Sequence, residues 1–175
     1  MLWIRRTYLQ MKLLFKQRFF SWFDSYNVYS LPDNVDADSY ELSDSDVRFV
    51  VEGQLALGHC FLINDSSGRE LGRLEKRLFT LLPEYDIYIG NELYGTVERE
   101  FSLFTKSFNL DVRGWSISGD FLDWDYSIVD SSGNTVATIG KELFRLTDTY
   151  TIDIPDERDA LGVLMIAIAI DAERE

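Results

Sequence analysis

The C-terminal stretch ALGVLMIAIAIDAERE (160–175) decides the fold, because no polar side chain interrupts it between Ala160 and Ile170. The chain of 175 residues carries a net charge of −13, so this apolar run needs a buried place. As a helix the run would span about 16 Å, roughly half the thickness of a bilayer core. Charged residues flank it as DERD (156–159) and DAERE (171–175). We therefore expect it inside the protein, with no transmembrane segment.

A helix over residues 156–172 is the favoured structure for this stretch. A strand buried on both faces would show a similar apolar run, and periodicity does not separate the two. Length favours the helix, since strands of this length are uncommon. Pro155 is expected to end the preceding strand, and Asp156 is the expected N-cap. Because the segment is apolar all round, we expect core on every side of it.

An internal repeat supplies the material that surrounds this helix. Residues 63–89 and 128–154 align without a gap and are identical at 12 of 27 positions. The motif DSSG begins each copy, and Lys76 and Tyr85 of the first copy match Lys141 and Tyr150 of the second. Weaker copies occupy residues 16–29 and 99–112. The unit therefore occurs four times.

Each copy has the pattern of a β-hairpin. YDIYI (85–89), FNLDV (108–112) and YTIDI (150–154) alternate between apolar and more polar side chains, as half-buried strands do. Turn segments such as LLPEY (81–85) separate the two arms, and each DSSG is a turn as well. Together with the segments between the hairpins, about ten to twelve strands are expected.

The sequence thus predicts a mainly β protein, a closed antiparallel barrel of about 12 strands wrapped around a C-terminal hydrophobic α-helix. A closed sheet of eight strands fills itself with its own side chains, whereas one of eleven or twelve has room for a helix about 10 Å across. The apolar segment at 156–172 is the candidate occupant.

The composition limits the classes of function. Length and a hydrophobic content of 46% fit one domain with a sizeable core. With 30 acidic against 17 basic residues, no nucleic-acid partner is expected. The single cysteine, Cys60, fits a reducing compartment, so we expect a cytoplasmic protein. The start of the chain has neither the apolar core nor the cleavage site of a secretion signal.

No catalytic signature stands out in the sequence. It has no glycine-rich phosphate loop and no G-x-S-x-G elbow, and His59 is its one histidine. Nucleophilic serine or cysteine chemistry and a zinc site therefore lack partners. His59 and Cys60 are interpreted as two neighbours on a strand. We expect no enzyme activity, no cofactor and no metal ion.

Five stretches form a combination that is specific to one family. They are FFSWFDSYNVY (19–29), VEGQLALGHCFLI (51–63), DSSGNTVATIGKE (130–142), TDTYTIDI (147–154) and DALGVLMIAIAIDAE (159–173). Together they resemble the bacterial branch of the LURP-one-related family, which is similar in fold to the C-terminal domain of tubby proteins and to phospholipid scramblases. The resemblance covers nearly all of residues 11–173. It implies a barrel of roughly twelve strands around a C-terminal helix.

Two segments depart from the family pattern. The family copies begin near MKLLFKQRFF (11–20), so residues 1–10 are predicted to be an N-terminal extension and 11–175 a single barrel domain. Residues 30–49 form an enlarged acidic connection, with an acidic loop at 30–47, whose carboxylates are expected to repel one another in solvent. Their spacing lacks the glycine and the terminal glutamate of an EF-hand, which disfavours a calcium site.

The candidate lipid-contact site lies at the start of the chain. Residues 1–23 carry +5 and the remainder −18, because five cations precede the first acidic residue: Arg5, Arg6, Lys12, Lys16 and Arg18. Aromatic side chains alternate irregularly with them, as in interfacial segments. Tubby domains bind phosphoinositide head groups, so the resemblance implies lipid binding for this chain as well. The alternative is that residues 12–29 simply form the first hairpin.

Trp115 and Trp124, with Asp123 and Asp125, mark a second candidate place, a barrel mouth that could hold a small ligand. Aromatic core packing is the favoured interpretation, because alternation along a strand sends both aspartates to the side opposite Trp124.

These observations predict a non-catalytic binding or scaffolding module. One hypothesis is peripheral binding to a lipid surface. The other is a protein-interaction domain that uses its acidic surface or the 30–49 loop. The fold does not decide between the two, and the oligomeric state has no signature in the sequence.

Overall fold

The computed structural model describes residues 10–16, 25–32, 35, 40–56, 58–101, 107–120, 125–142 and 149–173. These residues contain twelve strands, two 3-10 helices and one α-helix. The strands are β1 (Met11–Lys16), β2 (Ser25–Leu31), β3 (Val47–Ala56), β4 (Gly58–Asp65), β5 (Glu70–Lys76), β6 (Glu84–Ile89), β7 (Glu92–Glu100), β8 (Ser107–Asp111), β9 (Ser116–Asp120), β10 (Asp125–Val129), β11 (Thr135–Glu142) and β12 (Thr149–Ile154). The chain ends in α1 (Ala160–Asp171).

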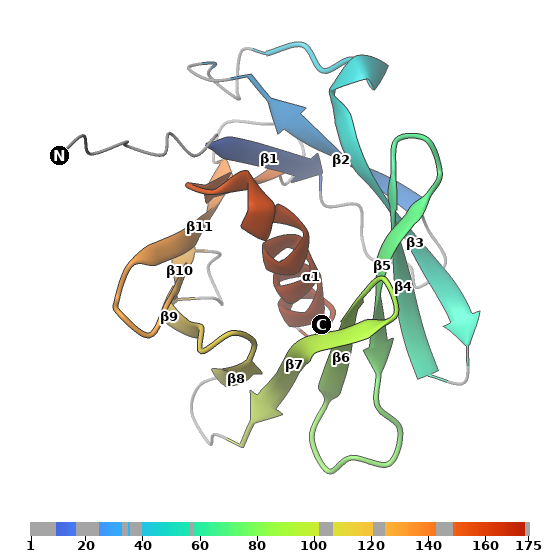
Figure 1. Cartoon of the computed structure of the whole chain (residues 1–175), viewed down its shortest axis with the longest axis vertical. Helices are drawn as coiled ribbons and strands as arrows, with labels where there is room; N and C mark the ends of the chain where they lie inside the picture. Colours follow the sequence, from blue (N-terminus) through green and yellow to red (C-terminus); the bar gives the residue numbers. More distant parts are fainter. Residues whose placement is uncertain are drawn as a thin grey trace, which may run out of the picture.

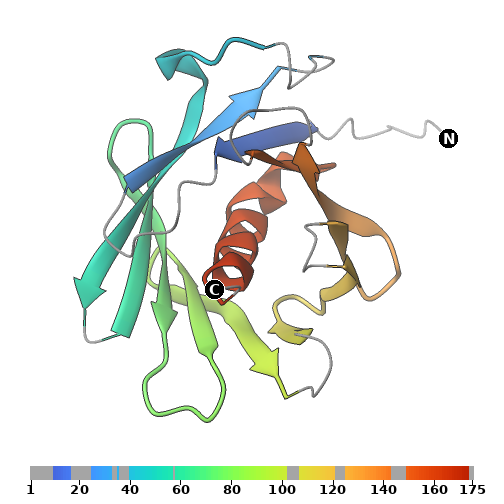
Figure 2. The same cartoon turned by 180° about the vertical axis from the view of Figure 1, so that it is seen from behind.

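All twelve strands belong to one antiparallel sheet, in the order β8-β7-β6-β5-β4-β3-β2-β1-β12-β11-β10-β9. The sheet curls into a nearly closed barrel around α1 (Figure 1, Figure 2). The outermost strands β8 and β9 approach each other, and among the described residues no ladder joins them. The predicted mainly β barrel of about 12 strands is confirmed, with its seam between β8 and β9.

The helix fills the inside of the barrel, as its composition predicts. Every residue of α1 except Leu161 is buried, and Leu164 and Ile166 are fully enclosed. A 3-10 turn (Glu157–Asp159) precedes α1, and the Asp156 carboxylate accepts a hydrogen bond from the backbone N–H of Arg158 at 3.1 Å. Asp156 therefore caps the 3-10 turn, while the α-helix proper begins later than the predicted residue 156.

The four repeat copies are the hairpins β1–β2, β5–β6, β7–β8 and β11–β12. The two strongest copies share a register, since Lys76 pairs with Tyr85 and Lys141 pairs with Tyr150. Both DSSG motifs are turns that end on a glycine with positive φ, +85° at Gly68 and +81° at Gly133. Alternate residues of the strands face the helix and form one core with it.

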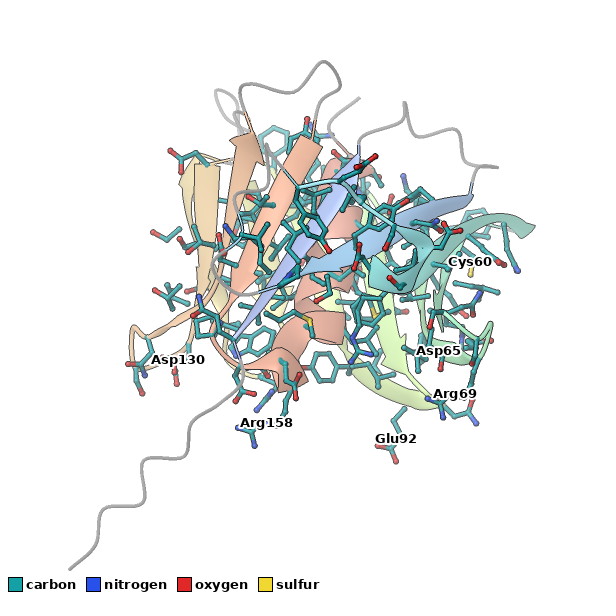
Figure 3. The ribbon with its side chains drawn as sticks, turned by 90° about the horizontal axis from the view of Figure 1, so that it is seen from above. Cys60, Asp65, Arg69, Glu92, Asp130 and Arg158 are labelled. Atoms are coloured by element: carbon teal, nitrogen blue, oxygen red, sulfur yellow. The ribbon has the colours of Figure 1, made fainter. Side chains whose placement is uncertain are left out.

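Hairpins that run the height of a barrel place their turns alternately at its two ends. We call the end where α1 begins the helix-start rim; it carries the turns at 66–69, 90–91, 112–115 and 130–134. Figure 3 shows Asp65, Arg69, Glu92, Asp130 and Arg158 toward this end of the barrel. The opposite end, the helix-end rim, carries the loop at 77–83 and receives the end of α1.

Part of the acidic connection between β2 and β3 packs against the sheet where it is described. Tyr40 and Leu42 pack against Leu14 and Leu31, which form a small cluster separate from the barrel core. The Asp46 carboxylate accepts hydrogen bonds from the Ser43 N–H at 2.9 Å and the Tyr40 hydroxyl at 3.2 Å. The bonds from Ser43 first, and then that from Tyr40, lower the pKa of Asp46. The expected repulsion among its carboxylates in solvent stays a prediction: Glu41 and Asp44 are exposed, while the apolar residues of this part cover β1 and β2.

Candidate functional site

Only one of the predicted lipid-contact cations has a described side chain. Lys12 lies on β1 opposite Asp153 of β12, and its Nζ is 3.3 Å from the Asp153 carboxylate. Both side chains are about one-third exposed, at 34% and 39%. Arg5, Arg6 and Arg18 lie outside the described residues, and Lys16 is described by its backbone alone, as the last residue of β1. The proposed cluster therefore stays a prediction, and Lys12 is already ion-paired.

A buried polar cluster that the sequence patterns did not predict lies where α1 ends. Glu173 follows the helix, and its Oε1 accepts hydrogen bonds from Lys76 Nζ and from the Tyr85 hydroxyl, both at 2.6 Å. Lys76 and Tyr85 are partners across the β5–β6 ladder. A carboxylate close to the end of a helix faces the negative end of the helix dipole, so a cation and a hydroxyl group compensate it.

This cluster holds its tyrosine in the protonated form. Burial first, and then the Glu173 carboxylate, raise the pKa of Tyr85 well above its usual value. Burial likewise raises the pKa of Tyr26, with the charge of Asp171 as the second cause. The repeat shows two members of the cluster, since Lys76 and Tyr85 recur as Lys141 and Tyr150 in the other strong copy, but Glu173 lies outside both copies. The contacts of Lys76 and Tyr85 with Glu173 hold the end of the helix against the barrel wall, and we call these three residues the lock.

A second cluster fastens the other end of the helix. Arg113, in the turn between β8 and β9, forms an ion pair with Asp159 at 2.6 Å, just before α1 begins. Its guanidinium lies 5.3 Å from the ring centre of Trp115, which packs edge-on against Tyr94. Trp115 is buried, so aromatic packing is confirmed for it over a ligand-binding mouth. Trp124 and Asp123 lie outside the described residues, and Asp125 is exposed at the start of β10.

Nothing in the described part of the chain assembles a metal site or an activated nucleophile. Within those residues no group of three or more His, Cys, Asp and Glu side chains could hold a metal ion. Cys60 is half-buried on β4, next to His59 in sequence as expected. Burial, followed by the nearby Glu75 carboxylate, raises the pKa of the Cys60 thiol, which lowers its reactivity.

The two rims differ in how many large apolar side chains they expose to solvent. At the helix-end rim Phe79 and Leu81 are fully exposed, at 102% and 104%, Phe101 is largely exposed, and Leu78 is about half exposed. At the helix-start rim one large apolar side chain of the described residues, Leu93, is exposed by more than half. The sequence predicted a turn at LLPEY (81–85) and no role for these apolar residues.

The sequence matches the LURP-one-related family model over residues 11–171. The chain belongs to the LURP-one-related family. Among its relatives, the uncharacterized protein YxjI of Bacillus subtilis (strain 168) is 30% identical over 161 residues, which cover 91% of each chain. Membership gives the fold and no activity, because this relative carries no assigned function.

The fold is also that of a known crystal structure. A protein from Arabidopsis thaliana shares the architecture with a TM-score of 0.60 and 14% sequence identity, over 94% of this chain and 93% of the other. At that identity the likeness concerns the fold alone. The resemblance inferred from the sequence is thus confirmed, and the LURP-one-related chain has a tubby-like fold. No described helix is long and apolar enough to cross a membrane.

Proposed function

We propose that this LURP-one-related chain is a non-catalytic binding module that attaches peripherally to a lipid surface. The observation that carries the proposal is the position of α1: its side chains take the space that a ligand would need inside the barrel, so recognition falls to the outer surface. The exposed apolar side chains at the helix-end rim and the basic, aromatic start of the chain are the features of that surface that suit lipid.

The cations proposed for the lipid contact are Arg5, Arg6, Lys12, Lys16 and Arg18. They would act by attraction to anionic head groups, which weakens at high salt because the screening length is about 8 Å at physiological ionic strength. Lys12 should contribute least, since Asp153 already compensates its charge. We place the module in the cytoplasm, at the membrane periphery, because its single cysteine suits a reducing compartment.

Vesicle co-sedimentation of the full chain tests this proposal. The protein is mixed with phosphatidylcholine vesicles, with and without phosphatidylserine or a phosphoinositide, at low and high salt. Binding to any of these membranes supports the proposal, and stronger binding to the anionic ones supports the role of the cations. Charge reversal at Lys16 and Arg18 should then remove the anionic preference, and reversal at Lys12 should change it less. A chain that sediments with no vesicle of any composition would refute the proposal.

The alternative is a protein-interaction domain that meets a basic partner. It is favoured by the acidic connection, where Tyr40 and Leu42 hold the segment against the sheet while Glu41 and Asp44 remain exposed. Charge reversal at Lys12, Lys16 and Arg18 separates the two functions. It should abolish the preference for anionic vesicles under the first and leave capture of a basic partner intact under the second.

A further inference from the structure

The loop between β5 and β6 presents an apolar tip to solvent. Its residues Leu78, Phe79 and Leu81 are exposed by 49%, 102% and 104%, and a polar Thr80 lies between the last two. Large apolar side chains gathered on one exposed loop are uncommon on a monomer and usually mark a contact surface. The packing of the barrel does not require them, because their exposure shows that they contribute nothing to its core.

The base of the loop is held in shape by the strands below it. The Arg77 N–H donates to the Glu84 carbonyl at 2.8 Å, which closes the loop. The Arg77 guanidinium also binds the Asp86 carboxylate through two hydrogen bonds, at 2.7 and 2.9 Å, and contacts the Glu84 carboxylate. A loop fixed in this way loses little conformational entropy when it binds, which favours a role as a preformed anchor.

Phe79 has a backbone conformation that disfavours a bulky residue. Its φ is +63°, in the left-handed region that glycine and asparagine adopt most readily. The residue is fully exposed as well, so neither local backbone preference nor packing explains a phenylalanine here. Strain of this kind is found preferentially at functional sites.

A second apolar point stands on the same rim. The Arg99 N–H of β7 donates to the Pro83 carbonyl at 2.9 Å, which ties the loop to the neighbouring strand. Phe101 follows β7 and is 78% exposed. Two separate apolar points on adjacent parts of one rim fit a continuous apolar medium, which receives both without matching their shape. A protein partner would need a separate cavity for each.

The charges at the base of the loop indicate which kind of membrane fits. Arg77 is bound to Glu84 and Asp86, and Lys76 is bound to Glu173. Each of these cations already has a carboxylate partner, so an anionic head group would have to displace one. The tip therefore has no electrostatic need for anionic lipid and should insert through apolar burial alone.

We propose that the apolar tip at residues 78–81, together with Phe101, inserts into the interface of a zwitterionic phospholipid membrane. This inference rests on the proposed lipid-surface function and identifies the part of the surface that enters the lipid. It places the helix-end rim against the bilayer, so of the cations proposed above it favours Lys16, the last residue of β1, over Lys12 near the start of that strand.

Flotation of the full chain with pure phosphatidylcholine vesicles tests the inference. The variant Phe79→Asp/Leu81→Asp should lower the vesicle partition coefficient by about tenfold or more, because it puts carboxylates where apolar side chains enter the lipid. Leu93→Asp is the matched control, since Leu93 is an exposed apolar residue at the opposite rim (56%), and it should leave partition unchanged. Circular dichroism and thermal unfolding confirm that both variants fold, as substitutions at exposed sites allow.

A fluorescent reporter gives a second, independent reading. In a Cys60→Ser background, Leu81→Cys carrying an environment-sensitive dye should shift to the blue when phosphatidylcholine vesicles are added. The same dye at Leu93→Cys should not shift. Partition of the wild type that changes little with salt supports apolar insertion.

The contrary outcomes separate the two proposals. If the wild type binds vesicles and the double variant binds equally well, the tip is not the anchor, and the lipid-surface function stands without it. If the wild type binds vesicles only when anionic lipid is present, insertion into zwitterionic membrane is refuted. If it binds no vesicle at all, both proposals fail and the protein-interaction alternative gains.

Discussion

The two rims of the barrel differ in which groups they leave accessible to solvent: the helix-start rim leaves carboxylates partly accessible, and the helix-end rim exposes apolar side chains. At the helix-start rim the Asp65 carboxylate accepts hydrogen bonds from the Ser67 N–H, the Ser67 hydroxyl and the Arg69 N–H, at 2.6 to 3.0 Å. Asp130 does the same for the matching turn, binding Ser132 and Asn134. At the helix-end rim a carboxylate, that of Glu173, is buried, while Phe79 and Leu81 point into solvent.

This difference separates the parts of the molecule that stabilise it from the part available to a partner. The two DSSG turns at the helix-start rim satisfy polar groups internally, so they offer a partner little to bind. The helix-end rim leaves apolar side chains uncovered, and such side chains mark a contact surface. Both rims depend on the helix between them, which is locked to the wall at each end by Asp159 and by Glu173.

The largest expected effect lies in the helix that both rims share. Ile166→Asp places a carboxylate at a fully buried position inside the barrel, where desolvation costs several kcal/mol, about 5 or more. The variant should therefore fail to fold, as measured by circular dichroism and urea unfolding. Ile166→Val is the control and should cost about 1 kcal/mol. An Ile166→Asp protein that melts like the wild type would show that the helix is not central to the fold.

The next largest effect concerns the lock at the helix-end rim. Lys76→Met leaves the Glu173 carboxylate buried without its cation and should lower the free energy of unfolding by about 3 kcal/mol. Adding Glu173→Gln should recover part of that loss, because the stranded charge is removed. The surface pair of Lys12 and Asp153 is the control, and Lys12→Met should cost less than about 1 kcal/mol. Equal losses from Lys76→Met and Lys12→Met would refute the lock.

The two rims should also respond to pH at opposite ends of the scale. Hydrogen bonds from the Ser67 hydroxyl first, and then from Arg69, lower the pKa of Asp65 to about 2. Its contribution to the free energy of unfolding is therefore complete above the unfolded pKa of 3.8 and is lost as the pH falls toward 2. The pKa of Tyr85 is raised above 10, so its contribution is complete below pH 10 and is lost as pH rises further.

Two substitutions test this pH dependence by urea unfolding at a series of pH values. Asp65→Asn should flatten the loss of stability between pH 4 and 2, because it removes the titrating carboxylate at the helix-start rim. Tyr85→Phe should flatten the loss above pH 10, and Tyr88→Phe, on the outside of the same strand, serves as its control. Asp65→Asn should leave the loss of stability above pH 10 unchanged, and Tyr85→Phe should leave the loss between pH 4 and 2 unchanged. The reverse pattern would show that these two groups do not cause the pH dependence.

The smallest expected effect is on the tip itself. Phe79→Gly relieves a left-handed backbone conformation and removes no packing, so stability should change by less than about 1 kcal/mol and in the favourable direction. Thermal unfolding measures the change, and Thr80→Gly, next to it in the loop, is the control. A clear destabilisation would mean that Phe79 supports the barrel, which would weaken the case for a tip that serves a partner.

The sequence by itself determined the features that depend on neighbours along the chain. The apolar run at 160–170 implied a helix inside a barrel because no other place hides all of its faces. The alternation within YDIYI and YTIDI gave the hairpins, and the DSSG motifs gave two turns, since these patterns arise from local backbone geometry. The family resemblance rested on the same stretches and was confirmed.

Only the tertiary structure decided which distant groups meet and which stay exposed. The ion pair of Lys76 and Glu173 joins residues 97 positions apart, so no local pattern could reveal it. The loop at 77–83 was predicted only as a turn, because a sequence does not tell whether the rest of the protein will bury an apolar turn residue. Tyr40 and Leu42 show the opposite case. They belong to a segment whose composition is acidic, yet the fold packs them against Leu14. Burial depends on how elements pack together, and it is therefore a property of the folded chain as a whole.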